Sequence, residues 1–169
     1  MKRVLITGAN SFVGVNVEKW LLQTPDEFIV ETVDTMNEAW KKADFAKYDV
    51  VFHVAGIAHV DPKPKMAPLY YKVNRDLTIE IAKWAKKHGV KQFIFMSSKI
   101  VYHASKSLKG DVITENTKPH PNDFYGDSKL QAENGLRKLE SSSFKVALLR
   151  PCMLSLIHIS EPTRRVVIS

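Results

Sequence analysis

The chain has 169 residues, of which 44% are hydrophobic and 25% are charged, so it can bury the core of one ordinary domain and is neither disordered nor fibrous in composition. Its formal net charge is +7, but the lysines of residues 83–91 are spread over helical faces and form no Arg-rich stripe, which argues against nucleic acid as a partner. A single cysteine excludes an internal disulfide framework, and the spacing of cysteine and histidine predicts no metal site.

The first predicted element is a strand at residues 3–7. Its apolar run is too short for a signal peptide or a membrane helix, so we expect a cytoplasmic protein with no membrane partner. Beyond it, short β-rich runs alternate with longer amphipathic stretches. We expect helices at residues 13–22 and 69–88, and strands at residues 28–33, 50–54 and 93–96.

A second cycle of the same kind follows. A polar loop at residues 103–123 leads into a predicted helix at 125–139 and a strand at 145–149. Strands that are apolar throughout, alternating with amphipathic helices, are typical of a parallel sheet covered on both faces. The sequence therefore predicts an α/β fold with a doubly wound parallel sheet of the Rossmann type.

The first strand runs into the segment TGANSFVG, which places Gly8 and Gly14 on the first strand-to-helix turn. Glycine in such a turn lets the backbone approach a pyrophosphate, and the helix N-terminus supplies N–H groups and positive dipole. Ser11 stands where the middle glycine is usual. Asp34 lies twenty residues beyond Gly14, where a carboxylate can bind the adenosine ribose and would repel a 2′-phosphate. NAD is therefore favoured over NADP, although glycines in an ordinary tight turn and a solvated Asp34 would look the same.

Tyr125 and Lys129 open the predicted helix one turn apart, on the same face. A lysine ammonium beside a phenol lowers its pKa and makes tyrosine a usable acid or base. Tyr102 and Lys106 have the same spacing, but they lie in a turn-like segment where that spacing need not align side chains. Ser98 ends a predicted strand on the side of the sheet where ligands bind, so it can hydrogen-bond the reacting oxygen beside Tyr125.

Six segments in this order resemble the extended short-chain dehydrogenase/reductases, and within them the NAD-dependent epimerase/dehydratases of nucleotide sugars. The resemblance covers residues 1–153 and rests on TGANSFVG, HVAG, VNRD, SSKIVY, YGDSK and LLRP. It implies that Ser98 and Tyr125 handle the proton of a sugar hydroxyl while a hydride passes to NAD. It also implies that Lys129 binds the nicotinamide ribose and tunes Tyr125.

The same resemblance, together with the glycine-rich turn, implies a set of cofactor-binding residues. These are Gly8, Ser11, Phe12, Val13, Gly14, Asp34, Asp44, Phe45, Val54, Ala55, Gly56, Asn74, Ser97, Tyr125, Lys129 and Pro151. The implied substrate is a nucleotide sugar. Helix 69–88 can form a homodimer as in relatives, but its apolar face is equally explained by packing on the sheet.

Four positions depart from the family pattern. Ser11 and His103 replace glycines, which affects the geometry of their loops, and Lys99 and Ile100 stand where dehydratases carry an acidic pair. Epimerisation or keto reduction is therefore favoured over dehydration. Two other functions stay open: a non-catalytic NAD-sensing protein of the same fold, and an NADP-linked carbonyl reductase.

The last stretch fits none of these patterns. Residues 154–164, LSLIHISEPTR, resemble the translation of an adaptor used to prepare sequencing libraries. We expect residues 1–153 to form the NAD-binding domain and residues 154–169 to be a non-native tail, the alternative being a genuine short strand. If the tail is non-native, the C-terminal substrate-binding part of the family is missing. We then expect the fragment to bind cofactor poorly and to convert little or no substrate.

Overall fold

The computed structural model describes residues 1–58, 64–102 and 112–151. Its centre is a parallel sheet of five strands in the order β2-β1-β3-β4-β5. The strands are β1 (Lys2–Thr7), β2 (Phe28–Val33), β3 (Val50–His53), β4 (Gln92–Met96) and β5 (Lys145–Leu149). The order reverses between β1 and β3, and open α/β sheets bind ligands at the carboxyl ends of the strands at such a point. The predicted fold class is confirmed.

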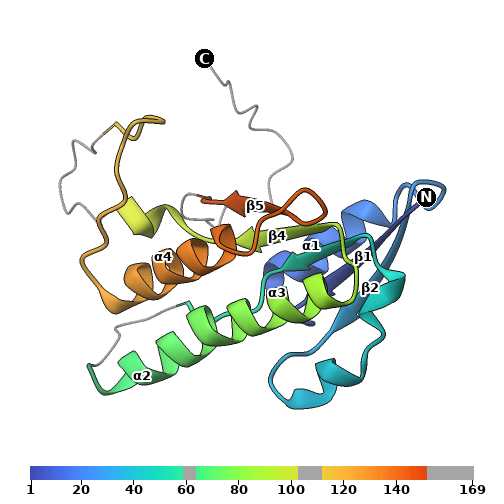
Figure 1. Cartoon of the computed structure of the whole chain (residues 1–169), viewed down its shortest axis with the longest axis horizontal. Coiled ribbons are helices and arrows are strands. Elements are labelled where there is room, and N and C mark those ends of the chain that lie inside the picture. Colours follow the sequence, from blue (N-terminus) through green and yellow to red (C-terminus); the bar gives the residue numbers. More distant parts are fainter. Residues whose placement is uncertain (59–63, 103–111, 152–169) are drawn as a thin grey trace, which may run out of the picture.

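Helices cover both faces of the sheet. On one face, α1 (Phe12–Leu21) packs through Val13 and Val17 against Val4 and Ile6 of β1. On the other face, α3 (Thr78–Lys87) and α4 (Phe124–Arg137) lie side by side (Figure 1). This arrangement explains why β3 is buried along its whole length.

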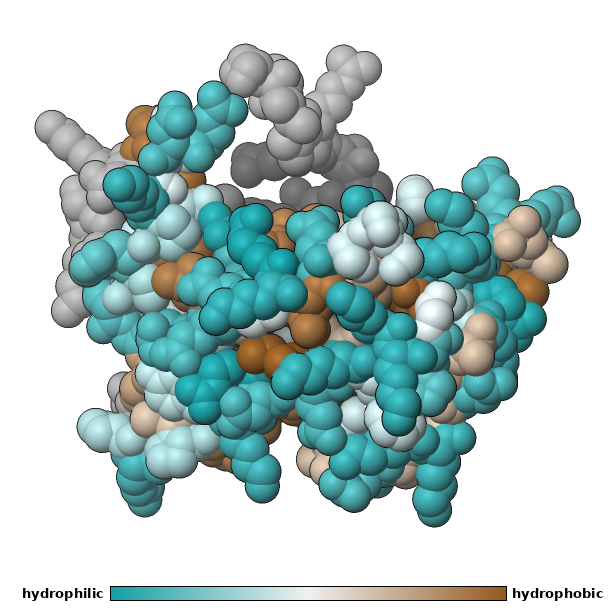
Figure 2. Space-filling view, in the orientation of Figure 1, coloured by the Kyte–Doolittle hydropathy of each residue, from teal (hydrophilic) through white to brown (hydrophobic). Residues whose placement is uncertain are grey.

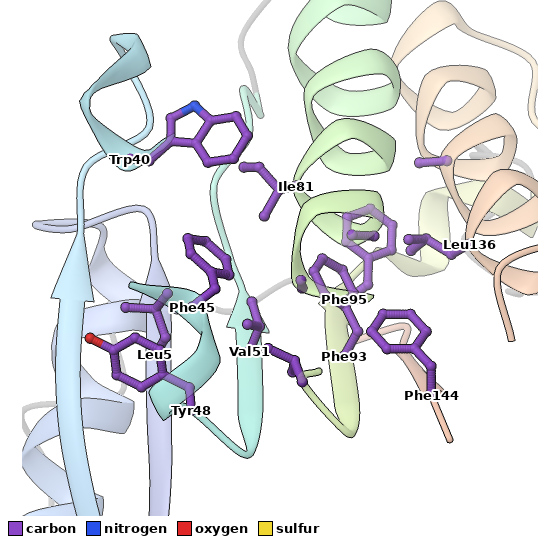
Figure 3. Close-up of a cluster of buried hydrophobic side chains, with 14 residues drawn as sticks. Leu5, Trp40, Phe45, Tyr48, Val51, Ile81, Phe93, Phe95, Leu136 and Phe144 are labelled. Atoms are coloured by element: carbon purple, nitrogen blue, oxygen red, sulfur yellow. The ribbon is translucent and has the colours of Figure 1, made fainter. Parts of the chain in front are cut away.

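The larger hydrophobic cluster lies between the sheet and the α3–α4 layer. Phe93 and Phe95 of β4 point toward Ile81 of α3 and Leu136 of α4 (Figure 3). The outer surface of this layer is mainly hydrophilic, with apolar side chains showing between the helices (Figure 2). The apolar face of the predicted helix 69–88 therefore packs on the sheet. In the described ranges, no helix is both long enough and apolar enough to span a bilayer.

The segment between β2 and β3 had no predicted element. It forms two short 3₁₀ helices, Glu38–Lys42 and Phe45–Lys47, capped by the side chains of Asn37 and Asp44. Trp40, Phe45 and Tyr48 of this segment are buried in the larger cluster. Their irregular spacing matches neither a strand nor a regular helix, which is why periodicity did not reveal them.

The predicted helix 69–88 is a continuous helical stretch of three parts. Between α2 (Ala67–Tyr70) and α3 lies a π-helix, Tyr71–Leu77, whose wider turns bury the polar residue Asn74. A π-helical segment inside an α-helix often marks a functional site. The other predicted elements end within two residues of those observed.

Some predictions fall on residues outside the described ranges. They concern His103, Lys106 and the rest of residues 103–111 of the predicted loop, and the tail 154–169.

Candidate active site

A cavity of about 930 Å³ opens at the carboxyl ends of β1, β2 and β3. It lies where the strand order reverses, which is the position expected for a bound ligand. The glycine-rich turn, the segment after β2, the loop after β3 and the helical stretch 69–80 form its walls. Six of the predicted cofactor-binding residues line it: Gly8, Ser11, Asp34, Val54, Ala55 and Gly56.

The glycine-rich turn brings the backbone of β1 against the loop after β3. Gly8 has a φ of 95°, and a Cβ there would lie 2.8 Å from the amide nitrogen of Ala55. A Cβ on Gly14 would lie 2.7 Å from Oγ of Ser11. Both positions therefore require glycine. Asn10 also adopts a positive φ of 64°, a conformation that asparagine tolerates better than most residues.

Ser11, which replaces the usual middle glycine, has a clear structural task. It is the N-cap of α1, and its Oγ accepts a hydrogen bond of 3.1 Å from the amide of Gly14. The amides of Phe12 and Val13 belong to the first turn of α1 and have no acceptor inside the helix. The turn can therefore hold an anionic pyrophosphate at a helix N-terminus.

Asp34 follows β2 and is exposed at the cavity wall. Its Oδ1 accepts a hydrogen bond of 2.9 Å from the amide of Met36, which fixes the carboxylate and leaves Oδ2 for a ribose hydroxyl. Sequence reasoning missed Lys41, a base that also lines this cavity. The Lys41 ammonium lies 2.9 Å from carboxylate oxygens of both Glu38 and Glu80. In the sequence, only the spacing between Glu38 and Lys41 indicated the first of these contacts.

Asp44 and Phe45 do not line the cavity in the described part of the chain. Oδ1 of Asp44 accepts a hydrogen bond of 3.1 Å from the amide of Ala46. The Phe45 ring is fully buried and meets Trp40 edge to face. Their place near an adenine stays a prediction.

Asn74 is hydrogen-bonded to the loop after β3, which forms part of the cavity wall. Its side chain is fully buried and forms hydrogen bonds of 2.9 Å with both the amide and the carbonyl of Ile57. A Cβ on Gly56 would lie 3.0 Å from the Asn74 side-chain oxygen and 3.2 Å from Nζ of Lys129. The amide of Asn74 thus fixes the loop after β3, and Gly56 gives it and Lys129 the room they need.

The Ser98 hydroxyl lies beside the Tyr125 phenol, close enough to lower its pKa by hydrogen bonding. Tyr125 lies in the first turn of α4, which Asp123 caps by accepting a hydrogen bond from Gly126. Burial raises the pKa of the Tyr125 phenol, and the hydrogen bond with Ser98 lowers it in part. The phenol is therefore protonated at neutral pH.

The expected effect of Lys129 on Tyr125 needs correction. Lys129 is not among the described groups that shift the pKa of Tyr125, which is raised rather than lowered. The ammonium of Lys129 instead donates a hydrogen bond of 3.0 Å to the carbonyl of Met96 and lies 4.7 Å from the ring centre of Phe95. Burial lowers the pKa of Lys129 itself to about 8. Spacing on a helix predicted proximity but not where the flexible lysine chain would direct its charge.

Ser97 and Pro151 lie at the ends of β4 and β5. Ser97 is buried, and its Oγ donates a hydrogen bond of 2.5 Å to Oε1 of Glu133. The carbonyl of Pro151 accepts a hydrogen bond of 3.0 Å from the amide of Lys99. Glu133 was not predicted, although it lies four residues after Lys129 on the same helix. Its spacing from Lys129 was the only signal.

The fold, the glycine-rich turn and the cavity at the strand ends define a dinucleotide-binding protein of the Rossmann type. The chain belongs to the NAD dependent epimerase/dehydratase family, whose model matches residues 4–166. The predicted family is confirmed. The family is NAD-dependent, so the predicted cofactor is also confirmed at that level.

Individual relatives agree with this assignment. The chain is 33% identical to a UDP-glucose 4-epimerase of Vibrio cholerae over an alignment of 174 residues, which covers 90% of this chain and 52% of that protein. It is 31% identical to the human UDP-glucose 4-epimerase over 128 residues, covering 71% of this chain and 35% of that protein. The chain thus spans about half the length, or less, of these curated relatives.

Solved structures share the fold. The UDP-glucuronic acid 4-epimerase of Bacillus cereus, in complex with NAD, superposes with a TM-score of 0.73 at 22% identity, covering 89% of this chain and 56% of that one. A Pseudomonas aeruginosa protein, RMD, complexed with NADPH, superposes with a TM-score of 0.72 at 24% identity, covering 89% and 54%.

Proposed function

We propose that the protein to which this domain belongs is an NAD-dependent epimerase of a UDP-linked sugar, with Ser98, Tyr125 and Lys129 as its catalytic residues. The contact between Ser98 and the buried phenol of Tyr125 carries the proposal. The buried ammonium of Lys129 lies beside Gly56, a residue of the cavity wall. The activity printed for the Vibrio cholerae and human relatives supports the choice of substrate.

NAD, when bound, takes a hydride from a sugar carbon and can return it. The chain's own task is to move the hydroxyl proton at that carbon. Tyr125 holds its proton at neutral pH because burial raises its pKa, so it is suited to donate a proton to a ketone oxygen. To accept a proton in the reverse step, the phenol needs added positive charge nearby, as the oxidised nicotinamide provides.

Ser98 orients the reacting oxygen. It lies two residues after the end of β4. Its Oγ accepts a hydrogen bond of 3.3 Å from the amide of Ile100, so the hydroxyl proton of Ser98 can point elsewhere. One hydroxyl that bonds both Tyr125 and a sugar oxygen would hold the two reacting groups in line.

Lys129 supplies a positive charge in a site that excludes water, since the residue is only 5% exposed. Its proposed role is to donate a hydrogen bond from the ammonium to a ribose hydroxyl of the cofactor. Because its pKa is about 8, the charged form loses population as pH rises through this value, and cofactor binding should weaken there.

The residues after Ser98 support epimerisation or reduction over dehydration. Elimination of water needs a second acid and base beside the sugar, whereas the chain has Lys99 and Ile100 at these positions. This choice rests on the resemblance to the family and on the absence of a carboxylate at these two positions.

The test is an assay of the protein expressed from its full reading frame, after sequencing the gene again beyond codon 153. The protein is incubated with NAD and a panel of UDP- and GDP-sugars, and the products are separated by chromatography. We expect interconversion of a UDP-sugar with its epimer, and loss of at least two orders of magnitude in rate for Tyr125→Phe, roughly the contribution of one acid–base group.

Tyr71→Phe is the matched control. Tyr71 donates its hydroxyl proton to Asp127 at 2.6 Å on the outer side of α4, so this variant should keep the rate. No product from any sugar, or equal rates for wild type and Tyr125→Phe, would contradict the proposal.

Two other functions are separated by simpler observations. An NADP-linked carbonyl reductase would share the fold, as the NADPH complex of the Pseudomonas protein shows, but it would bind NADPH more tightly than NADH. Asp34 at the cavity wall argues against this. A non-catalytic NAD-sensing protein would bind NADH and be unaffected in all functions by Tyr125→Phe.

A further inference from the structure

Behind the catalytic residues lies a buried ion pair that the proposed chemistry does not use. Glu133 of α4 is fully buried, and both of its carboxylate oxygens are occupied. Oε1 accepts hydrogen bonds from Oγ of Ser97 at 2.5 Å and from Nε of Arg150 at 2.9 Å. Oε2 accepts a hydrogen bond from Nη2 of Arg150. A buried pair of this kind is an inefficient source of stability, because desolvation offsets much of the attraction.

The pair reaches both ends of the segment that carries Ser98. Ser97, at the start of the segment, bonds Glu133, while Tyr102, at its end, accepts a hydrogen bond from Nη1 of Arg150. The guanidinium of Arg150 also lies 4.8 Å from the ring centre of Tyr102. Residues 97–102 are therefore attached to one rigid pair at two points, with Ser98 between them.

Backbone contacts strengthen this attachment from the β5 side. The amide of Ser97 donates to the carbonyl of Leu149 at 2.8 Å, and that of Lys99 donates to Pro151 at 3.0 Å. Arg150 lies between these two acceptors. Movement of the Glu133–Arg150 pair would thus displace Ser98 from the phenol of Tyr125.

The carboxylate of Glu133 also acts on Lys129, one turn earlier on α4. Burial lowers the pKa of Lys129, and the charge of Glu133 raises it in part. The other groups that face Lys129 are the carbonyl of Met96, the ring of Phe95 and the imidazole of His53, which is neutral because burial lowers its pKa to about 3. Among these, Glu133 is the negatively charged group, and its charge adds to the carbonyl and ring contacts that favour the ammonium.

We propose that Glu133, held by Arg150, is a positioning residue of the active site: it fixes Ser98 against Tyr125 and places a carboxylate one turn from Lys129 on α4. The proposal rests on the proposed function for its consequence in catalysis, but its geometry is tested without turnover.

The experiment follows two titrations by NMR, with ¹³C in the lysine ε-carbons and the tyrosine ζ-carbons. The Lys129→Met and Tyr125→Phe variants assign the two signals. In Glu133→Gln we expect the midpoint of Lys129 to fall below its wild-type value, and the pKa of Tyr125 to rise because the hydrogen bond with Ser98 is weakened. Glu140→Gln, which removes an exposed carboxylate near the end of α4, should leave both unchanged.

Ser97→Ala separates the effect on Tyr125 from the effect on Lys129, because it leaves the Glu133–Arg150 ion pair buried. It therefore tests the proposal even if Glu133→Gln fails to fold. It should raise the pKa of Tyr125 and leave the midpoint of Lys129 in place. In the full-length enzyme, the basic limb of the pH–rate profile should move to lower pH in Glu133→Gln but not in Ser97→Ala.

An unchanged Tyr125 pKa in Ser97→Ala would overturn the proposal, as would an unchanged Lys129 midpoint in a folded Glu133→Gln variant. These results are distinct from a failure of the proposed function. Titrations that shift as expected in a protein without epimerase activity would refute the proposed function alone.

Discussion

The imidazole of His53 predicts a specific loss of stability in acid. His53 is fully buried at the end of β3, and its Nδ1 lies 2.5 Å from Oγ1 of Thr7 and its Nε2 lies 2.9 Å from Oγ1 of Thr78. The rings of Phe93 and Phe95 lie against it. Burial, and to a lesser degree the charge of Lys129, lowers the pKa of His53 from 6.5 to about 3.

The sign of the effect follows from which state binds the proton. Below 6.5 the unfolded chain takes up a proton at His53, whereas the folded protein does so only near pH 3. Stability is therefore complete above the unfolded value and declines as pH falls toward 3. The full shift corresponds to about 5 kcal/mol, of which about 2 kcal/mol is lost between about pH 7.5 and about pH 5.

The assay is urea unfolding followed by tryptophan fluorescence at about pH 7.5, 6 and 5. His53→Gln keeps hydrogen-bonding groups between the two threonines but cannot titrate. It should be less stable than wild type near neutral pH, and the difference between the two should shrink by about 2 kcal/mol at about pH 5. All other titrating groups are common to both proteins and cancel. A constant difference at all three pH values would refute the reasoning.

Further predictions concern the cofactor cavity. Gly8→Ala should abolish NADH binding and destabilise the fold, because the new Cβ meets the backbone of Ala55. The control Gly89→Ala is also at positive φ but has nothing within 4 Å, so it should lower the free energy of unfolding by only about 1 kcal/mol. Urea unfolding and NADH fluorescence titrations compare the two variants. Ser11→Ala removes the N-cap of α1 and should lower the free energy of unfolding by about 1 kcal/mol, and an unchanged urea midpoint would contradict the capping role. Asp34→Asn should weaken NADH binding roughly 10-fold or more, because a charge-assisted hydrogen bond of about 1.5–3 kcal/mol is lost. Its affinity for NADPH relative to NADH should improve. An equal loss of affinity for both cofactors would count against a ribose contact.

The parts of the fold that were predictable are those with a clear period. The strands Phe28–Val33 and Lys145–Leu149 agree with their predicted bounds, because apolar β-rich runs between turn residues have few alternatives. The segment after β2 was not predictable, since Trp40, Phe45 and Tyr48 are buried by tertiary packing and follow no period. The π-helix was missed for a similar reason: the Asn74–Ile57 hydrogen bonds that accompany it join residues far apart in the sequence.

The candidate site shows the same division. Sequence reasoning placed Ser98 after a strand end and Tyr125 at a helix start, and the structure places these two side chains beside each other. It did not predict that Lys129 would direct its charge to Met96, or that Glu133 and Arg150 would meet behind the site. Those outcomes depend on long side chains from different elements sharing a buried space, which no single-segment pattern encodes.

The most direct test of the proposed chemistry is the near-ultraviolet absorbance of reduced NAD. The full-length protein, loaded with NAD and mixed with a UDP-sugar in a single turnover, should show transient formation of the reduced cofactor. Tyr125→Phe should bind both ligands but show this signal far more slowly. A wild-type protein that converts the sugar without any reduced NAD, or a Tyr125→Phe variant with an unchanged rate, would contradict hydride transfer at the Ser98–Tyr125–Lys129 site.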